Sequence, residues 1–87
     1  MSEYKILLEK PAVRFIEKLP RTEKERLLHA IYRLPHDGDI KRLRGQKALE
    51  LYRLRVGSYR IIYTVDDGKL VVCVIDAGNR GQIYNRY

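Results

Sequence analysis

Three arginines, Arg53, Arg55 and Arg60, interrupt the most regular apolar stretch of the chain, LYRLRVGSYRIIYTV at 51–65. Side chains on a β-strand point alternately to the two faces of its sheet. If Gly57 and Ser58 form a two-residue turn, Arg55 lies directly opposite Arg60, and Arg53 shares their face. The alternate residues then form a core face. Because like charges placed opposite each other destabilise a sheet, this pattern indicates that the arginine face serves a function.

The guanidinium group suits one kind of ligand particularly well. Its planar fork binds phosphate oxygens bidentately, and it stays charged at every relevant pH. Three such groups on a rigid sheet predict a preformed phosphate site. The alternative is that acidic residues elsewhere in the chain pair with these arginines, or that the face is simply solvated.

The basic charge of the chain is concentrated around these arginines. The net charge is +7, from 18 Lys and Arg against 11 Asp and Glu. Between residues 41 and 60, Glu50 is the single acid. A basic field of this kind predicts a polyanionic partner, most often nucleic acid, although a solvated basic surface is the alternative. The residues predicted to bind RNA beside the three arginines are Lys41, Arg42, Arg44 and Lys47.

The composition excludes several other classes of protein. A chain of 87 residues with 45% hydrophobic residues predicts one globular domain over residues 1–87. The longest apolar run, Leu70 to Ile75, is far too short to span a bilayer, and the N-terminus carries no export signal. Cys73, His29 and His36 form no metal-ligand pattern, so neither a metal nor a cofactor is expected. A cytoplasmic location, away from membranes, is the expectation.

The first third of the chain predicts a strand followed by a helical hairpin. Residues 4–9 are rich enough in apolar side chains for a strand. Pro11 suits the first turn of a helix that the LPR segment at 19–21 ends. Thr22 and Glu25 have the spacing of a capping box at the start of a second helix, and Pro35 follows its end.

The rest of the chain predicts a β-meander. Residues 35–47 are expected to form a loop, and the three strands that follow are expected at 51–56, 59–65 and 70–76. Gly57-Ser58 fits a type II′ turn, and Asp67-Gly68 fits a type I′ turn. The predicted class is α+β, with the helices packed on one face of an antiparallel sheet.

A short polar tail is expected after the last strand. Its segment GNRGQIY at 78–84 can bring Arg80 and Tyr84 to one end of the sheet. Tyr84 either stacks on an unpaired base, as aromatic side chains do in RNA complexes, or fixes the tail in place.

Three segments carry a resemblance to a known family: KRLRG at 41–45, the hairpin at 51–65, and VVCVIDAGNRGQIY at 71–84. The chain resembles the RelE/ParE toxin superfamily and, within it, the RelE-type mRNA interferases. The resemblance covers nearly the whole chain and implies a RelE-like fold. It also implies a toxin that enters the ribosomal A site and cuts mRNA there, and a cognate antitoxin that neutralises it.

The resemblance also implies a set of catalytic residues. RelE-type toxins have basic residues at the positions matching Arg53, Arg55 and Arg60, an arginine matching Arg80, and a tyrosine matching Tyr84. In such enzymes the ribose 2′-OH attacks the adjacent phosphate, which leaves a 2′,3′-cyclic phosphate and a free 5′-OH without a metal. By this resemblance Arg53 and Arg60 hold the scissile phosphate, Arg80 faces the leaving oxygen, and Tyr84 positions a base.

The chain departs from the family at two of these positions. The best-known members have lysines where Arg53 and Arg55 stand, and an arginine cannot give up its proton to act as a base. One explanation is that Arg55 orients the 2′-OH while the cations stabilise the charge that develops on phosphorus. The other is that Tyr84, the ribosome or water supplies the base.

Two other functions are compatible with the same sequence. A ParE-like toxin would poison DNA gyrase through protein contacts and would need no nuclease chemistry. A non-catalytic module would use the arginines only to bind RNA or the ribosome. Arg80 and Tyr84 favour the endoribonuclease.

Overall fold

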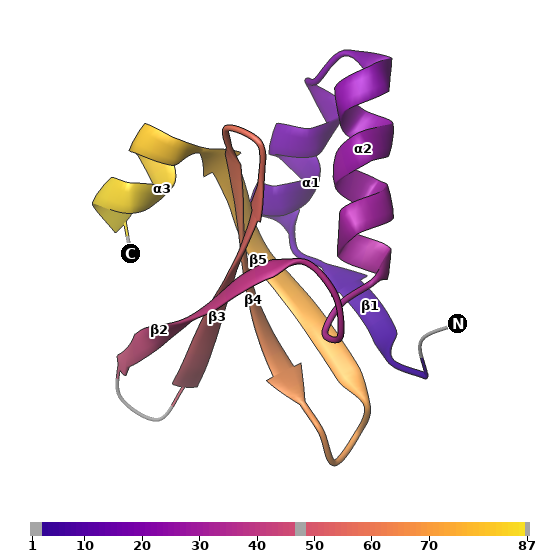
Figure 1. Ribbon diagram of the computed structural model, residues 1–87, viewed down its shortest axis with the longest axis vertical. Helices are drawn as coiled ribbons and strands as arrows, with labels where there is room; N and C mark the ends of the chain where they lie inside the picture. Colours follow the sequence, from indigo (N-terminus) through magenta and orange to yellow (C-terminus); the bar gives the residue numbers. More distant parts are fainter. Residues whose placement is uncertain (1–2, 47–48, 87) are drawn as a thin grey trace.

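The computed structural model describes the backbone of residues 3–46 and 49–86, and their side chains except those of 44–46, 49 and 84–86. One sheet has the strand order β1-β5-β4-β3-β2 (Figure 1). The elements are β1 (Lys5–Leu8), α1 (Lys10–Glu17), α2 (Arg21–Tyr32), β2 (Asp39–Gln46), β3 (Leu49–Val56), β4 (Tyr59–Asp66), β5 (Val71–Asn79) and α3 (Arg80–Arg86). The predicted α+β class is confirmed.

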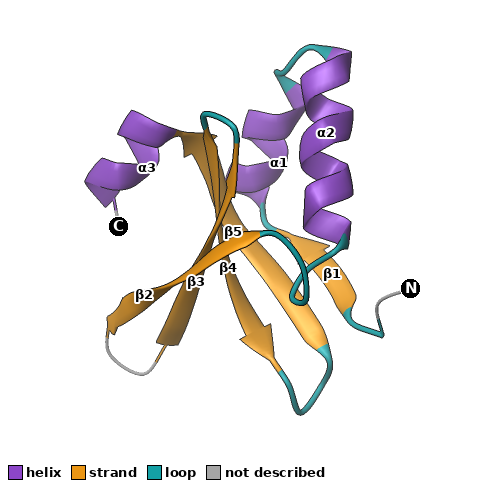
Figure 2. Ribbon diagram, viewed as in Figure 1, coloured by secondary structure: helices purple, strands orange, loops and turns teal. Residues whose placement is uncertain are grey.

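The predicted helical hairpin, α1 and α2, covers one face of the sheet (Figure 2). Pro11 lies in the first turn of α1, where its missing N–H removes no helical hydrogen bond. The prediction of a capping box is wrong, because α2 begins at Arg21 with Pro20 at its N-cap and has no side-chain cap. Thr22 is therefore already inside the helix.

The main core lies between this hairpin and the sheet. Aliphatic side chains at helical spacing on α1 and α2 meet the inward-facing residues of β3, β4 and β5. Its buried members are Ala12, Ile16, Leu27, Ile31, Leu34, Leu54, Val56, Ile61, Tyr63, Val72, Val74 and Ala77. Alternation along the strands leaves the opposite face of the sheet for the arginines.

Residues 35–47 are not the uniform loop that their glycines and polar residues predict. Residues 39–46 form β2, an edge strand that pairs antiparallel with β3. Ile40 lies opposite Leu54 and packs against the main core, which explains why this polar segment joins the sheet.

The polar tail is a helix rather than an irregular segment. In α3 the side chain of Ile83 is buried against Leu51 and Ile62, in a second, smaller cluster on the face away from α1 and α2. The helices therefore lie on both faces of the sheet, and α3 covers only one end of the second face (Figure 2).

Two strand connections complete the sheet. β1 pairs in parallel with β5, so the first strand of the chain joins the last. The predicted type I′ turn at Asp67-Gly68 is wrong: β4 ends at Asp66, β5 starts at Val71, and Leu70 has a positive φ of 55°. Because the connection is longer than two residues, the last strand starts at Val71 and not at residue 70 as predicted.

None of the helices in the described part of the chain is long and apolar enough to cross a membrane.

Candidate functional site

The pairing of β3 with β4 brings three arginines onto one face of the sheet. Arg55 lies directly opposite Arg60, and Arg53 lies opposite Ile62, in the register that the sequence predicts. The connecting turn is type II′, because Gly57 has a φ of +61° whereas Ser58 does not have a positive φ. We call Arg53, Arg55 and Arg60 the arginine cluster.

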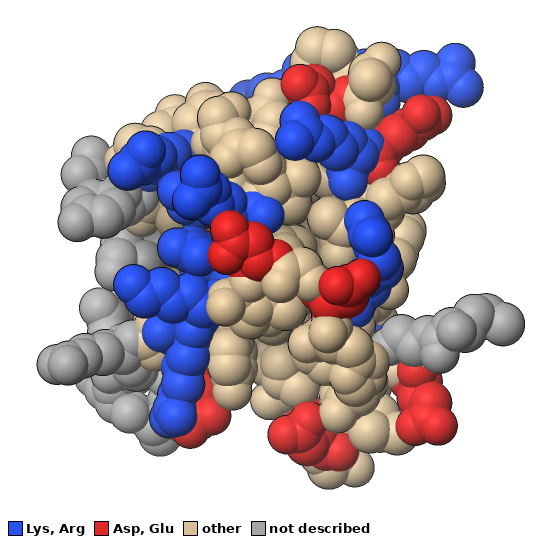
Figure 3. Space-filling view, in the orientation of Figure 1, with Lys and Arg blue, Asp and Glu red and all other residues tan. Residues whose placement is uncertain are grey.

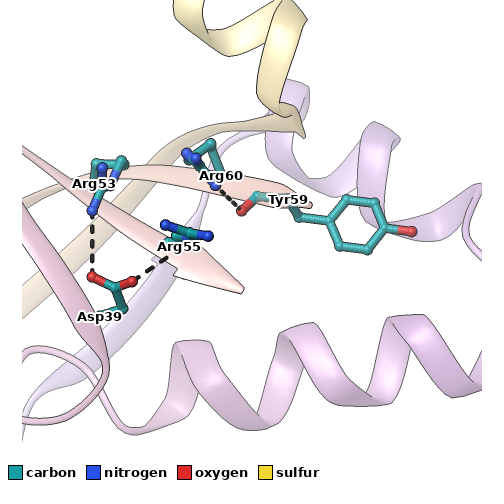
Figure 4. A network of polar contacts seen from close by, with 5 residues as sticks. All are labelled: Asp39, Arg53, Arg55, Tyr59 and Arg60. Carbon is teal, nitrogen blue, oxygen red and sulfur yellow. Dashed lines mark hydrogen bonds and ion pairs between the residues drawn. The ribbon is translucent and has the colours of Figure 1, made fainter. Parts of the chain in front are cut away.

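One carboxylate lies against the arginine cluster. Asp39, the first residue of β2, is directly opposite Arg55 in the β2–β3 pairing. Its Oδ1 lies 3.4 Å from Nη2 of Arg53, and its Oδ2 lies 3.9 Å from Nε of Arg55 (Figure 4). The alternative expected from the sequence, in which an acidic residue of the chain pairs with these arginines, therefore holds in part. The Asp39 carboxylate carries one negative charge against the three positive charges of the cluster.

The three arginines differ in their access to solvent. The side chain of Arg55 is 52% exposed and that of Arg53 is 21% exposed, whereas Arg60 is only 9% exposed. Nη1 of Arg60 donates to the main-chain oxygen of Tyr59 at 3.4 Å, while the Tyr59 ring points away from the cluster (Figure 4). Nε of Arg53 is buried and has no hydrogen-bond partner among the described residues. These are costs that a face selected for stability alone would avoid.

Arg60 carries the clearest electrostatic signature of the cluster. Burial lowers the pKa of its guanidinium, and the positive charges of Arg53, Arg55 and Arg80 lower it further, while Asp39 opposes them. Arginine nevertheless remains protonated in proteins. The cluster is therefore a fixed cationic site whose members repel one another until an anion binds.

The end of the hairpin holds a fourth guanidinium nearby. Arg80 is the first residue of α3, and its main-chain N–H donates to the oxygen of Ser58 in the turn at 3.0 Å. The positive charge of Arg80 is close enough to contribute to the lowered pKa of Arg60. Tyr84 lies in the same helix, but its side chain is outside the described residues, so its predicted role stays a prediction.

The residues predicted to bind RNA do not all gather on this face. Lys41 is exposed and lies opposite Arg53, on the arginine side of the sheet. Arg42 points to the other side and forms an ion pair with Glu50 at 2.7 Å. The side chain of Arg44 and all of Lys47 lie outside the described residues.

Basic side chains dominate one flank of the molecule. Figure 3 shows Lys and Arg gathered at the left, between α3 and the β2 end of the sheet, with fewer acidic side chains among them. Among the residues that the structure describes, no group of three or more His, Cys, Asp or Glu side chains could hold a metal ion. The site therefore offers guanidinium groups and a carboxylate, which suit phosphate binding and proton transfer.

Sequence reasoning misses Asp39 as a member of the site. A residue in an expected loop has no register, so nothing in the sequence places it opposite Arg55. The one available signal is weak: Ile40 and Leu43 are the apolar residues of an otherwise polar segment.

The chain is similar to known proteins in sequence and in fold. The sequence model for the ParE toxin of type II toxin–antitoxin systems, parDE, matches residues 6–84. No curated protein matches the chain. The RelE–RelB complex of the archaeon Pyrococcus horikoshii contains a chain 29% identical to this one, with a TM-score of 0.76, over 91% of this chain and 97% of that one.

Two bacterial structures are also similar. The isolated Escherichia coli RelE toxin is 32% identical, with a TM-score of 0.62, over 95% of this chain and 93% of that one. The toxin–antitoxin complex RelBE2 of Mycobacterium tuberculosis gives 26% identity and a TM-score of 0.73, over 88% of this chain and 98% of that one.

The chain belongs to the ParE toxin family of the RelE/ParE superfamily, and it is the toxin of a toxin–antitoxin system. The resemblance found in the sequence is thereby confirmed at the level of the superfamily.

Proposed function

We propose that this toxin is a ribosome-dependent, metal-independent endoribonuclease that cuts mRNA in the A site. The ribose 2′-OH attacks the adjacent phosphate, and the products are a 2′,3′-cyclic phosphate and a 5′-OH. The observation that carries the proposal is the direct opposition of Arg55 and Arg60. Such a pair disfavours folding, yet it suits the charge that develops on a phosphate under attack.

We assign a different role to each of the four guanidinium groups. Arg55 and Arg53 contact the scissile phosphate, because their side chains reach the surface. Arg60, which lies opposite Arg55 on β4 and is buried, adds positive charge beside them. Arg80 stabilises the leaving 5′-oxygen, and Tyr84 positions a base. Lys41, on the arginine side of the sheet, binds neighbouring RNA, and Arg44 and Lys47 are proposed to do the same. Arg42 is not included, because it points to the other side and pairs with Glu50.

The partner proposed for this toxin is a cognate antitoxin. Several of the similar structures are complexes of a RelE toxin with its RelB antitoxin. A cytoplasmic location follows from the proposal, because ribosomes and mRNA are the other partners.

A cell-free translation mixture tests this function. The wild-type toxin should cut mRNA at A-site codons, and Arg80→Ala should reduce the cleavage rate by about 10²-fold or more. The main-chain contact of Arg80 with Ser58 survives this change, so the fold should be unaffected. Arg21→Ala removes the same charge from an exposed position on α2 and should cleave like the wild type. Intact mRNA with the wild-type toxin would exclude the endoribonuclease.

A second candidate function is poisoning of DNA gyrase without chemistry. It is favoured by the match of residues 6–84 to the ParE toxin. Gyrase trapped on cleaved DNA, together with intact mRNA, would support it. Salt-sensitive binding to ribosomes with neither kind of cleavage would instead indicate a module that only binds RNA.

A further inference from the structure

We infer that Asp39 is the general base of this site: its carboxylate takes the proton from the attacking ribose 2′-OH. This inference rests on the proposed endoribonuclease function and names the group that the function lacks. Arginine cannot accept a proton, so Arg53, Arg55, Arg60 and Arg80 can bind and stabilise charge but cannot activate a hydroxyl group.

Asp39 is a carboxylate within ion-pair distance of the arginine cluster, and it is open to solvent. It is 60% exposed and lies between the two surface members of the arginine cluster. Asp76, on β5, is buried, and its Oδ1 accepts the N–H of Ala77 at 2.8 Å. The ring of His36 packs edge-on against Tyr4, at 5.5 Å between ring centroids.

The two guanidinium groups hold the carboxylate loosely. Their distances to Asp39, 3.4 and 3.9 Å, exceed the roughly 2.7–2.9 Å of a tight charge-assisted hydrogen bond. Because these contacts are long, Arg53 and Arg55 are available to a phosphate, and Asp39, which is held on β2 opposite Arg55, stays beside it. The attacking 2′-oxygen approaches that phosphate from within the same nucleotide, at about 3–3.5 Å from phosphorus. It then lies within reach of the carboxylate oxygen.

The step balances with water as the only other participant. Asp39 accepts the 2′-OH proton as the 2′-oxygen forms its bond to phosphorus. The bond from phosphorus to the 5′-oxygen breaks, and the 5′-oxygen takes a proton from water while Arg80 offsets its charge. Asp39 then returns its proton to solvent.

Several charged groups surround Asp39. The charged groups that share its face of the sheet are Lys41 on β2, Arg53 and Arg55 on β3, and Arg60 on β4, with buried Asp76 farther away on β5. A carboxylate base works only when it is ionised. The cleavage rate of the wild-type toxin should therefore fall towards acidic pH, and this fall should be absent from Asp39→Asn.

Single-turnover cleavage on mRNA-programmed ribosomes tests the inference. Asp39→Asn should lower the cleavage rate by about 10²–10⁴-fold. Its binding to RNA should be as tight as that of the wild type or tighter, because a negative charge next to the phosphate is lost. Asp37→Asn is the matched control: it makes the same change at an exposed carboxylate two residues earlier, paired with Arg33 at 3.8 Å. Its rate should be that of the wild type. Formate should restore part of the activity of Asp39→Ala.

The outcomes separate the two proposals. Wild-type cleavage with an equally active Asp39→Asn would overturn the role of Asp39 and leave the endoribonuclease intact. Faster cleavage by Asp39→Asn would overturn it too, since the carboxylate would then only compete with the phosphate. If the variant is unstable, the wild-type pH profile decides, because a rate that is constant towards acidic pH excludes a carboxylate base. A wild-type toxin that leaves mRNA intact would overturn both.

Discussion

Arg55 and Arg60 are direct cross-strand neighbours, and both project from the face of the sheet that α1 and α2 leave open. Their mutual repulsion lowers the stability of the folded protein, whereas the proposed activity requires both positive charges. Measurements of stability and of activity should therefore change in opposite directions when this pair is altered.

Replacing Arg55 by Thr should show this opposition. Removal of like charges from a cross-strand pair should stabilise the protein by about 0.2–1 kcal/mol, since the 3.9 Å contact with Asp39 is exposed and contributes little. Cleavage should fall by about 10²–10³-fold. Chemical denaturation and the translation assay measure the two effects. A clear loss of stability would mean that the pair does not repel in the folded protein.

The turn that sets the register should depend strictly on glycine. Gly57 has a φ of +61°, and an added Cβ would lie 3.0 Å from Nη2 of Arg26. Gly57→Ala should therefore destabilise the protein by about 1–2 kcal/mol. Gly81→Ala is the control, because nothing lies within 4 Å of its Cβ position and Gly81 is helical. It should be neutral or stabilise by about 0.5–1 kcal/mol. Equal stability of both variants would argue against the type II′ turn.

The small cluster under α3 should control where Arg80 lies. Ile83→Ala removes the buried side chain that α3 contributes. We expect α3 to detach locally, with faster hydrogen exchange at 80–86 and slower mRNA cleavage, while β3 and β4 keep their protection. Ile31→Ala, in the main core, should instead lower global stability by about 2–5 kcal/mol. Unchanged exchange in α3 would show that Ile83 does not anchor it.

The single cysteine should be unreactive at neutral pH. Burial raises the pKa of the Cys73 thiol to about 11, and its contact with Glu9, at 3.2 Å from Sγ to Oε2, adds to the effect. Its alkylation by iodoacetamide should be slow, and Glu9→Gln should accelerate it by lowering that pKa. The folded state holds this proton more tightly than the unfolded state. The stability contribution of the thiol should therefore be complete at neutral pH and decline as pH rises from 9.0 towards about 11. Equal alkylation rates in both proteins would exclude the influence of Glu9.

The central hairpin could be predicted from the sequence down to its residue pairs. Strict alternation around Gly57-Ser58 leaves one register that buries the apolar residues, and a slip by one position would expose them all. For the same reason the sequence predicts that the arginine cluster lies on one face of the sheet. The face on which Arg42 lies cannot be predicted in this way, because it depends on β2, a strand that the sequence does not indicate.

The two elements that sequence reasoning misses are both peripheral. β2 is an edge strand with few apolar residues, and its formation depends on pairing with β3 rather than on its own propensity. α3 has only seven residues, and among its described side chains Ile83 alone is buried. Short helices of this kind are stabilised by tertiary packing. The place of Asp39 against the arginines cannot be predicted without β2, because it follows from the same strand pairing.

The place of β5 in the sheet determines when the complete sheet can form during synthesis of the chain. This strand lies between β1 and β4 in the sheet, yet it is the last strand to be synthesised. Until Val71–Asn79 has left the ribosome, β1 has no neighbour, and the hairpin carrying the arginines lacks the support of one edge. An interrupted translation product that lacks β5 therefore carries the cationic hairpin in an incomplete sheet in which β1 is not joined to β4.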